Sequence, residues 1–359
     1  MKKLVLLITL PYLFINCSST DCCYDIPENL YFPPVDNSNT WETISPPDLS
    51  WNVSEIANLK DYLEQKNTKS FIILYNGKIV MEEYFNGHNM NDGWYWASSG
   101  KTLTATVTGI AQQEGLLNIN NKVSDYLGTG WTSALLEKEN LITCKNLLTM
   151  TSGLDDTFND ANDDCVNPNC LVYSADAGTK WAYDNVYVKL QDVVDAVTPN
   201  YTWETYFNEK LRDKIGMTGS WFYSGNASVY WSNTRSMARF GLLALNQGNW
   251  NGNIIVNQAY FNQATNTSQN INLSYGYLWW LNGKLSYKLP DVNFTFTGSI
   301  IPSAPDDMFC ALGKNDQKIY VSPSRRLVVV RMGNAADNEN FALSDFDEVL
   351  WQKINAVIN

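Results

Sequence analysis

Trp96-Ala97-Ser98-Ser99-Gly100-Lys101 holds the one Ser-x-x-Lys pattern of the chain. The segment 98–113 lacks proline, and its apolar side chains recur at helical spacing. They are Leu103, Val107, Ile110 and Ala111. This pattern predicts a buried helix that begins at the motif and places the ammonium group of Lys101 within reach of the Ser98 hydroxyl. An N-cap serine followed by a surface lysine would explain the same residues without catalysis.

The scarcity of histidine limits the chemistry that such a serine could use. The chain has a single histidine, His88, in a segment predicted to be a loop. A Ser/His/Asp mechanism therefore has only one candidate histidine, and in its place a lysine or tyrosine must take the proton from the serine. Desolvation lets a lysine act as a base, and a helix N-terminus favours a developing alkoxide. The motif thus predicts Ser98 as nucleophile and Lys101 as its base.

Composition indicates a globular chain with a sizeable core. The 359 residues are 45% hydrophobic and 13% aromatic, enough for one large domain or two small ones. The formal net charge of −12, without a basic stripe, excludes nucleic acid as a partner.

The N-terminus predicts export. Residues 1–16 form a signal, with Lys2 and Lys3 before an apolar run, and this run is too short to span a bilayer comfortably. Cys17 follows and is similar to the acylated cysteine of bacterial lipoproteins, although Asn16 departs from the usual small residue. Residues 17–47, rich in Ser, Asn, Asp and Pro, predict a lipid-anchored tether. We therefore expect a membrane-anchored lipoprotein of the cell envelope, periplasmic or on the outer surface, with simple secretion as the alternative.

The chain has seven cysteines, whose pairing has to be predicted. In an exported protein, Cys165 and Cys170 are close enough in sequence to close a small loop as a disulfide. Two free thiols are the alternative, and a zinc site is disfavoured because histidines and further nearby thiols are lacking.

The pattern along the chain predicts an α+β domain over 48–359. An amphipathic helix over 53–66 precedes a hairpin whose turn is Asn76-Gly77. Strands follow at 318–321 and 327–330, and the chain finishes with a helical pattern. We expect an antiparallel sheet flanked by the two terminal helices (48–97 and 295–359), a mainly helical inserted half (98–294), and a cleft between them.

Four segments in order give the chain its resemblance to the β-lactamase-related serine hydrolases, a family with penicillin-binding proteins, class C β-lactamases and esterases. They are Ser98-x-x-Lys101, the segment 142–154, the segment 178–185 with Tyr183-Asp184-Asn185, and the closing strands 317–333. The resemblance implies a β-lactamase/transpeptidase-like fold. It also implies that Tyr183 relays a proton with Lys101, and that Asn185 binds a substrate carbonyl while orienting Lys101.

The family's third motif, usually Lys-Thr-Gly or His-x-Gly, matches at Gly313-Lys314-Asn315-Asp316-Gln317. There Lys314 fits, whereas Asp316 stands where the family has glycine; either the strand is displaced or Asp316 points away from the cleft. By the same resemblance, Lys314 and Asp316 belong to the substrate-binding site, and the backbone amides of Ser98 and Gln317 form the oxyanion hole.

The resemblance implies hydrolysis of a carboxylic ester or amide in a small molecule or peptide through an acyl-enzyme on Ser98, with no metal or organic cofactor required. A true β-lactamase or D-amino-acid peptidase is the alternative, and Lys314 favours it because a cation can pair with a β-lactam carboxylate. A non-catalytic binding protein that keeps the fold is the alternative from another class, motivated by Asp316.

Overall fold

A six-stranded antiparallel sheet forms the centre of the molecule. The computed structural model describes residues 30–36, 38–155, 165–224, 227–337 and 343–358. The sheet has the order β10-β13-β14-β15-β1-β2. Its strands are β1 (Thr68–Tyr75), β2 (Lys78–Tyr84), β10 (Trp280–Leu281), β13 (Phe309–Gly313), β14 (Gln317–Ser322) and β15 (Leu327–Gly333). The pairing of β1 with β15 joins the two ends of the domain, so the predicted sheet is confirmed.

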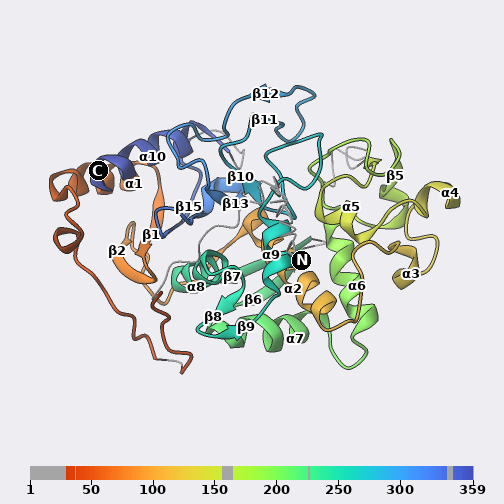
Figure 1. The fold of residues 1–359 in the computed structure, drawn as a ribbon, viewed down its shortest axis with the longest axis horizontal. Helices are drawn as coiled ribbons and strands as arrows, with labels where there is room; N and C mark the ends of the chain where they lie inside the picture. Colours follow the sequence, from red (N-terminus) through yellow and green to blue (C-terminus); the bar gives the residue numbers. More distant parts are fainter. Residues whose placement is uncertain (1–29, 37, 156–164, 225–226, 338–342, 359) are drawn as a thin grey trace, which may run out of the picture.

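Both faces of this sheet are covered. Helices α1 (Ile56–Gln65) and α10 (Asp345–Ile358) lie side by side on one face, and α8 (Thr234–Leu245) packs on β14, β15 and β1 (Figure 1). Burial on two faces explains why Phe71 to Leu74 in β1 read as a continuous apolar run, all with no exposed surface. The terminal helices were predicted, whereas α8 comes from within the inserted half.

Turn chemistry sets the β1–β2 register as predicted. Asn76 and Gly77 both have positive φ, at 50° and 82°, which suits the turn that matches the twist of a two-residue hairpin. The main chain at Gly77 is also crowded, because a Cβ atom there would lie 1.9 Å from the carbonyl oxygen of Tyr31.

The remaining helices lie in the inserted half, and several small sheets lie mainly within it. The helices are α2 (Lys101–Gln113), α3 (Ser124–Leu127), α4 (Leu136–Glu139), α5 (Cys144–Leu148), α6 (Lys189–Val197), α7 (Trp203–Phe207) and α9 (Gln258–Ala264). The strands pair as β3 (Trp94–Tyr95) and β6 (Ser220–Ser224) on either side of β7 (Ala227–Ser232), β4 (Leu154–Asp155) with β5 (Val172–Tyr173), β8 (Asn249–Trp250) with β9 (Asn253–Ile254), and β11 (Ser286–Tyr287) with β12 (Phe296–Thr297). Within the described residues, no helix is both long and apolar enough for a membrane span.

The described part of the predicted tether, residues 30–36 and 38–47, is packed on the domain. The amide of Tyr31 donates to Asn76 O (3.0 Å), and the indole N–H of Trp41 donates to Gly77 O (2.7 Å). Arg239 donates to the carbonyl oxygens of Pro33 and Pro34. The predicted boundary at residue 47 is therefore corrected: the aromatic residues within this polar segment bury their surface against the hairpin and α8. Cys17 and the signal lie outside the described residues.

Candidate active site

The Ser98 turn joins β3 to α2 and lies against the end of β13. Ser98 sits in the 3-10 turn Ala97–Gly100, and α2 begins at Lys101, as the spacing predicts. Ala97 has a φ of 47°, a left-handed conformation that non-glycine residues adopt at a cost. Trp96 is buried on one side of the turn, and its amide donates to Tyr230 O (2.8 Å). The Ser98 side chain is half-buried at the mouth of the buried helix.

Lys101 is held inside a shell of aromatic rings. Its residue is 3% exposed, and its Nζ donates to Oδ1 of Asn185 (3.3 Å). The same Nζ lies 4.1 Å from the ring centroid of Tyr187 and 5.0 Å from that of Tyr183. These contacts fix the position of the amine. The structure thus brings Lys101, Tyr183 and Asn185 together, as the motifs predict.

The Tyr183 side chain interacts with Ser98, and its ring lies beside Lys101. Burial raises the pKa of Tyr183 above its usual value, and hydrogen bonds with the Ser98 and Trp280 side chains act against that shift. The phenol is consequently protonated at neutral pH, and its hydroxyl touches the nucleophile. An un-ionised, hydrogen-bonded tyrosine can pass a proton in either direction, which is the relay role that the resemblance implies.

Gly313 supplies the glycine that the third motif requires. A Cβ atom at Gly313 would lie 2.5 Å from Trp96 O and 2.9 Å from the amide nitrogen of Ser99. Backbone atoms at that distance exclude any side chain, so β13 can approach the Ser98 turn only with glycine there. The motif is therefore Ala311-Leu312-Gly313, three residues before the match made from the sequence.

Asp316 lies away from the cleft, which corrects its predicted place in the substrate site. It is 1% exposed, its carboxylate accepts from the amide of Ala336 (2.9 Å), and it pairs with Lys318 (3.1 Å). Asn315 and Asp316 both have a φ of 60° because they form the tight β13–β14 connection. The Lys314 side chain is exposed at the same connection.

Gln317 is also unsuited to its predicted oxyanion role. It begins β14 opposite Gly313 and has no exposed surface. Its side chain makes two hydrogen bonds with Gly333 on β15. Nε2 donates to the Gly333 carbonyl oxygen (2.7 Å), and the Gly333 amide donates to Oε1 (3.1 Å). Gly313, and not Gln317, is the residue whose main chain lies directly against the Ser98 turn.

Two residues of the site were missed from the sequence. Trp280 on β10 bonds the Tyr183 hydroxyl, and its ring centroid lies 5.7 Å from that of Tyr183. Tyr187 contributes the nearest ring to Lys101. Tyr187 lies four residues after Tyr183, a spacing that could have suggested a shared face. Trp280 gave no such signal, because it comes from a distant part of the sequence and meets Tyr183 only in the folded chain.

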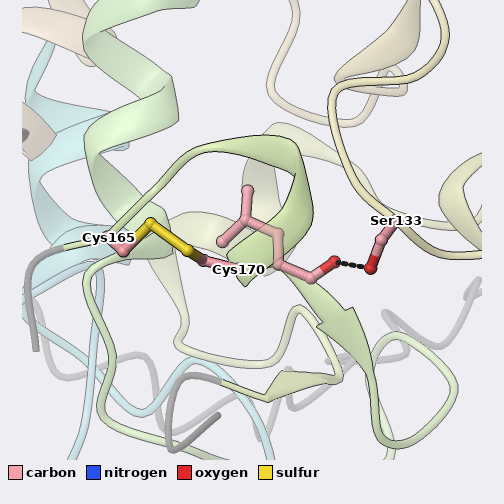
Figure 2. Close-up of a disulfide and its surroundings, with 4 residues drawn as sticks. Ser133, Cys165 and Cys170 are labelled. Carbon is pink, nitrogen blue, oxygen red and sulfur yellow. Dashed lines mark hydrogen bonds between the residues drawn. A yellow bond between two sulfur atoms is a disulfide. The ribbon is translucent and has the colours of Figure 1, made fainter. Parts of the chain in front are cut away.

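The predicted disulfide between Cys165 and Cys170 is present in the structure (Figure 2). It closes the turn before β5, and the next residue, Leu171, accepts a hydrogen bond from Ser133 Oγ (3.1 Å), shown as a dashed line in Figure 2. The disulfide belongs to the helical half and makes no contact with the Ser98 turn.

A cavity of about 440 Å³ opens beside the site, with Tyr183 in its wall. A second cavity of about 570 Å³ includes Trp280 in its wall. The two share Leu289 and Val292, which come from the segment between β11 and β12. The two cavities are thus neighbours, one bordered by Tyr183 and the other by Trp280.

Known proteins resemble this chain over most of its length. An uncharacterised protein of Alkalihalophilus pseudofirmus is 26% identical over 304 residues, which cover 74% of this chain and 83% of that protein. A solved structure described as a putative 6-aminohexanoate-dimer hydrolase from Bacillus anthracis has a TM-score of 0.67 at 18% identity, covering 90% of this chain and 89% of the other.

A third comparison and a family model extend this likeness. A hydrolase with promiscuous acyltransferase activity has a TM-score of 0.62 at 10% identity, with 88% of this chain and 99% of that one covered. At these identities the solved structures show the fold alone. The family model described as Beta-lactamase matches residues 57–350, a span that includes Ser98, Tyr183 and Gly313. With its sheet, inserted helices and Ser98 turn arranged in this way, the chain belongs to the β-lactamase family of hydrolases.

Proposed function

We propose that this protein is a serine hydrolase that forms an acyl-enzyme on Ser98 and cleaves a carboxylic ester or amide. One observation carries the proposal: the Ser98 side chain interacts with Tyr183, beside a buried Lys101 that Asn185 holds in place. A nucleophile, a proton relay and a base are thus connected without histidine.

The reaction proceeds in two balanced halves. The Ser98 proton passes through the Tyr183 hydroxyl to the unprotonated amine of Lys101, while Oγ attacks the substrate carbonyl carbon. When the scissile bond breaks, Lys101 returns the proton through Tyr183 to the leaving group. Water then enters, gives one proton to Lys101 by the same route and attacks the acyl carbon, and Ser98 leaves with that proton.

Backbone amides stabilise the oxyanion in this proposal. Ser98 supplies one amide at the N-terminal turn of α2, where the helix dipole favours negative charge. Lys314 supplies the other amide in place of Gln317, because it directly follows Gly313, the residue that lies against the Ser98 turn. The exposed Lys314 side chain is not needed for this role.

The corrected third motif favours an ester or amide over a β-lactam. Where the family usually has Lys-Thr before the glycine, this chain has Ala311 and Leu312, both 1% exposed. Neither side chain offers the cation or hydroxyl that a β-lactam carboxylate would meet at this strand. The alternative of a non-catalytic binding protein was based on Asp316, and Asp316 does not lie in the cleft.

Labelling and substrate comparison test the proposal. We expect a fluorophosphonate probe to modify folded protein at Ser98, detected by mass spectrometry, and not to modify Ser98→Ala. We expect hydrolysis of short-chain nitrophenyl esters to exceed that of a chromogenic cephalosporin. Absence of any Ser98 adduct across several probes would refute the acyl-enzyme, whereas rapid cephalosporin turnover without ester cleavage would establish a β-lactamase.

We also propose that the protein is exported and anchored to a membrane by lipid on Cys17. The apolar run after Lys2 and Lys3 supports this. Metabolic labelling with a fatty acid, followed by fractionation, checks it: the label and the membrane fraction should both be lost in Cys17→Ala. A labelled Cys17→Ala protein would contradict the assignment.

A further inference from the structure

The two cavities beside Tyr183 differ in charge. The first, here the Tyr183 cavity, is lined by Thr179, Lys180, Trp181, Ala182, Tyr183, Ile271, Lys288, Leu289, Asp291, Val292 and Asn293. The second, here the Trp280 cavity, is lined mainly by apolar side chains, with Asp345 and Glu348 as its charged residues. In a chain of net charge −12, the cavity that reaches Tyr183 is the one with two lysines.

The lysines of the Tyr183 cavity are available to a ligand. Lys180 Nζ donates to the hydroxyl of Ser174 (3.1 Å), a neutral partner. In the part of the chain that the structure describes, neither Lys180 nor Lys288 lies within 4.0 Å of a carboxylate, Asp291 of the same cavity included. Lys288 is half-buried, and Asn272 bonds both its amide and its carbonyl, which fixes its backbone. Two lysines in the lining, against the single acidic residue Asp291, favour an anionic ligand.

The Trp280 cavity would repel the same anion. Burial acts to raise the pKa of Glu348, but hydrogen bonds from Ser303 and Gln352 outweigh it and hold the pKa below its usual range. Glu348 is therefore ionised and lies with Asp345 in the first turn of α10. An apolar group enters this cavity more readily than a carboxylate does.

We propose that the Tyr183 cavity binds a leaving group that carries a carboxylate, held by Lys180 and Lys288, so that the substrate is an N-acyl amino acid or a similar amide or ester. This inference rests on the proposed acyl transfer at Ser98. Tyr183 protonates the leaving group, so the leaving group lies on the side where Tyr183 forms the wall. The apolar acyl part then occupies the Trp280 cavity, which shares Leu289 and Val292 with the Tyr183 cavity.

Binding to an inactive protein tests this without turnover. Calorimetry on Ser98→Ala compares N-hexanoyl-alanine with its methyl ester, which lacks the charge and adds one methyl group. We expect the acid to bind about tenfold more tightly, a difference of about 1.4 kcal/mol. Adding Lys180→Met and Lys288→Met should remove the difference, whereas Lys284→Met, a lysine that lines neither cavity, should preserve it. Equal binding of acid and methyl ester to Ser98→Ala would overturn the inference.

Kinetics on the active protein separates this inference from the proposed function. Hexanoyl esters of a neutral nitrophenol and of a carboxylated nitrophenol should both depend on Ser98, and the carboxylated one should have the higher kcat/KM. Ser98-dependent cleavage with no preference for the carboxylated ester, or with a preference that survives the double lysine variant, refutes the carboxylate site alone. Failure of every ester and amide, with tight binding of the acid retained, refutes the hydrolase proposal alone.

Discussion

At the scale of single residues, the site depends on a tyrosine that is kept neutral. Burial raises the pKa of Tyr183, so the hydroxyl keeps its proton and can deliver it to a departing group. The surrounding rings of Trp181, Tyr275 and Trp280 form edge-on or tilted contacts with Tyr183, which hold its hydroxyl toward Ser98. Removing the hydroxyl while keeping the ring therefore isolates the proton transfer.

Tyr183→Phe should slow cleavage most for substrates with poor leaving groups. Protonation of a leaving group contributes about 10²–10⁴-fold, and an alkyl ester or amide needs it more than a nitrophenyl ester does. We expect kcat/KM to fall by roughly that factor for alkyl esters and by less for nitrophenyl esters. Equal losses for both substrates would assign Tyr183 to positioning and not to proton delivery.

Gly313 makes a second prediction at this scale. Gly313→Ala places a Cβ atom 2.5 Å from Trp96 O, so either β13 or the Ser98 turn must move. A displacement of about 1 Å at a catalytic group can cost 10²-fold in rate, and we expect a loss of about that size together with a lower Tm. The matched control is Gly93→Ala, where the nearest atom would be 4.0 Å away, and it should change neither value.

The residues also show what the sequence could predict of the site. The spacing of Ser98 and Lys101 reflects local helical geometry, whereas Tyr183 and Asn185 were implied by the family resemblance; the structure brings all four together. Gly313 was missed because the match was made to the charged residues of the β13–β14 connection. Only the pairing of Gly313 with Gln317 and the approach of Gly313 to Trp96 show which residue faces the nucleophile.

At the scale of elements, a buried ionic cluster joins the β13–β14 hairpin to α10. Lys318 on β14 has no exposed surface and pairs with Asp316 (3.1 Å) and with Asp347 of α10 (2.9 Å). Tyr320 donates to the other oxygen of Asp347 (2.6 Å). The cluster anchors the connection that follows Gly313, so it supports the site from the far side of the sheet.

Lys318→Met should be strongly destabilising, since it leaves two carboxylates buried without their shared cation. Breaking a buried pair in this way costs about 3–5 kcal/mol. Lys60→Met, which removes the partner of Glu83 in a surface pair, should cost less than about 1 kcal/mol. Urea unfolding of both variants measures the difference. A cost for Lys318→Met no larger than that for Lys60→Met would show that the cluster does not hold the hairpin.

Elements with strong local signals were predictable, and those set by distant packing were not. The Asn76-Gly77 turn and the helix from Lys101 follow from a few neighbouring residues. The packing of α8 on the second face of the sheet does not follow from neighbouring residues. The apolar pattern of α8 predicts that the helix is buried, but it does not show which strands the helix packs against. The same is true of Trp280, which lies far from Tyr183 in the sequence.

At the scale of the whole molecule, the segment before α1 acts as part of the fold. Arg239 of α8 is buried between the rings of Trp41 (5.2 Å) and Trp250 (5.8 Å), and burial lowers its pKa to about 10. Its guanidinium donates to Ile215 O (2.9 Å) and Pro34 O (2.9 Å). The N-terminal segment thus completes the environment of a buried charge that belongs to the inserted half.

Truncation tests this role of the N-terminal segment. Removing residues 1–47 takes away Trp41 and the carbonyl acceptors at 33 and 34, and leaves Arg239 with fewer partners. A buried charge that loses partners costs several kcal/mol, so we expect a fall in Tm of about 10 °C or more. Removing residues 1–29 leaves every one of these contacts in place and should leave Tm unchanged. Adding Arg239→Met to the longer truncation should recover part of the loss, because the unpaired charge is then absent. Equal Tm values for the two truncations would show that residues 30–47 do not stabilise the domain and serve as a tether.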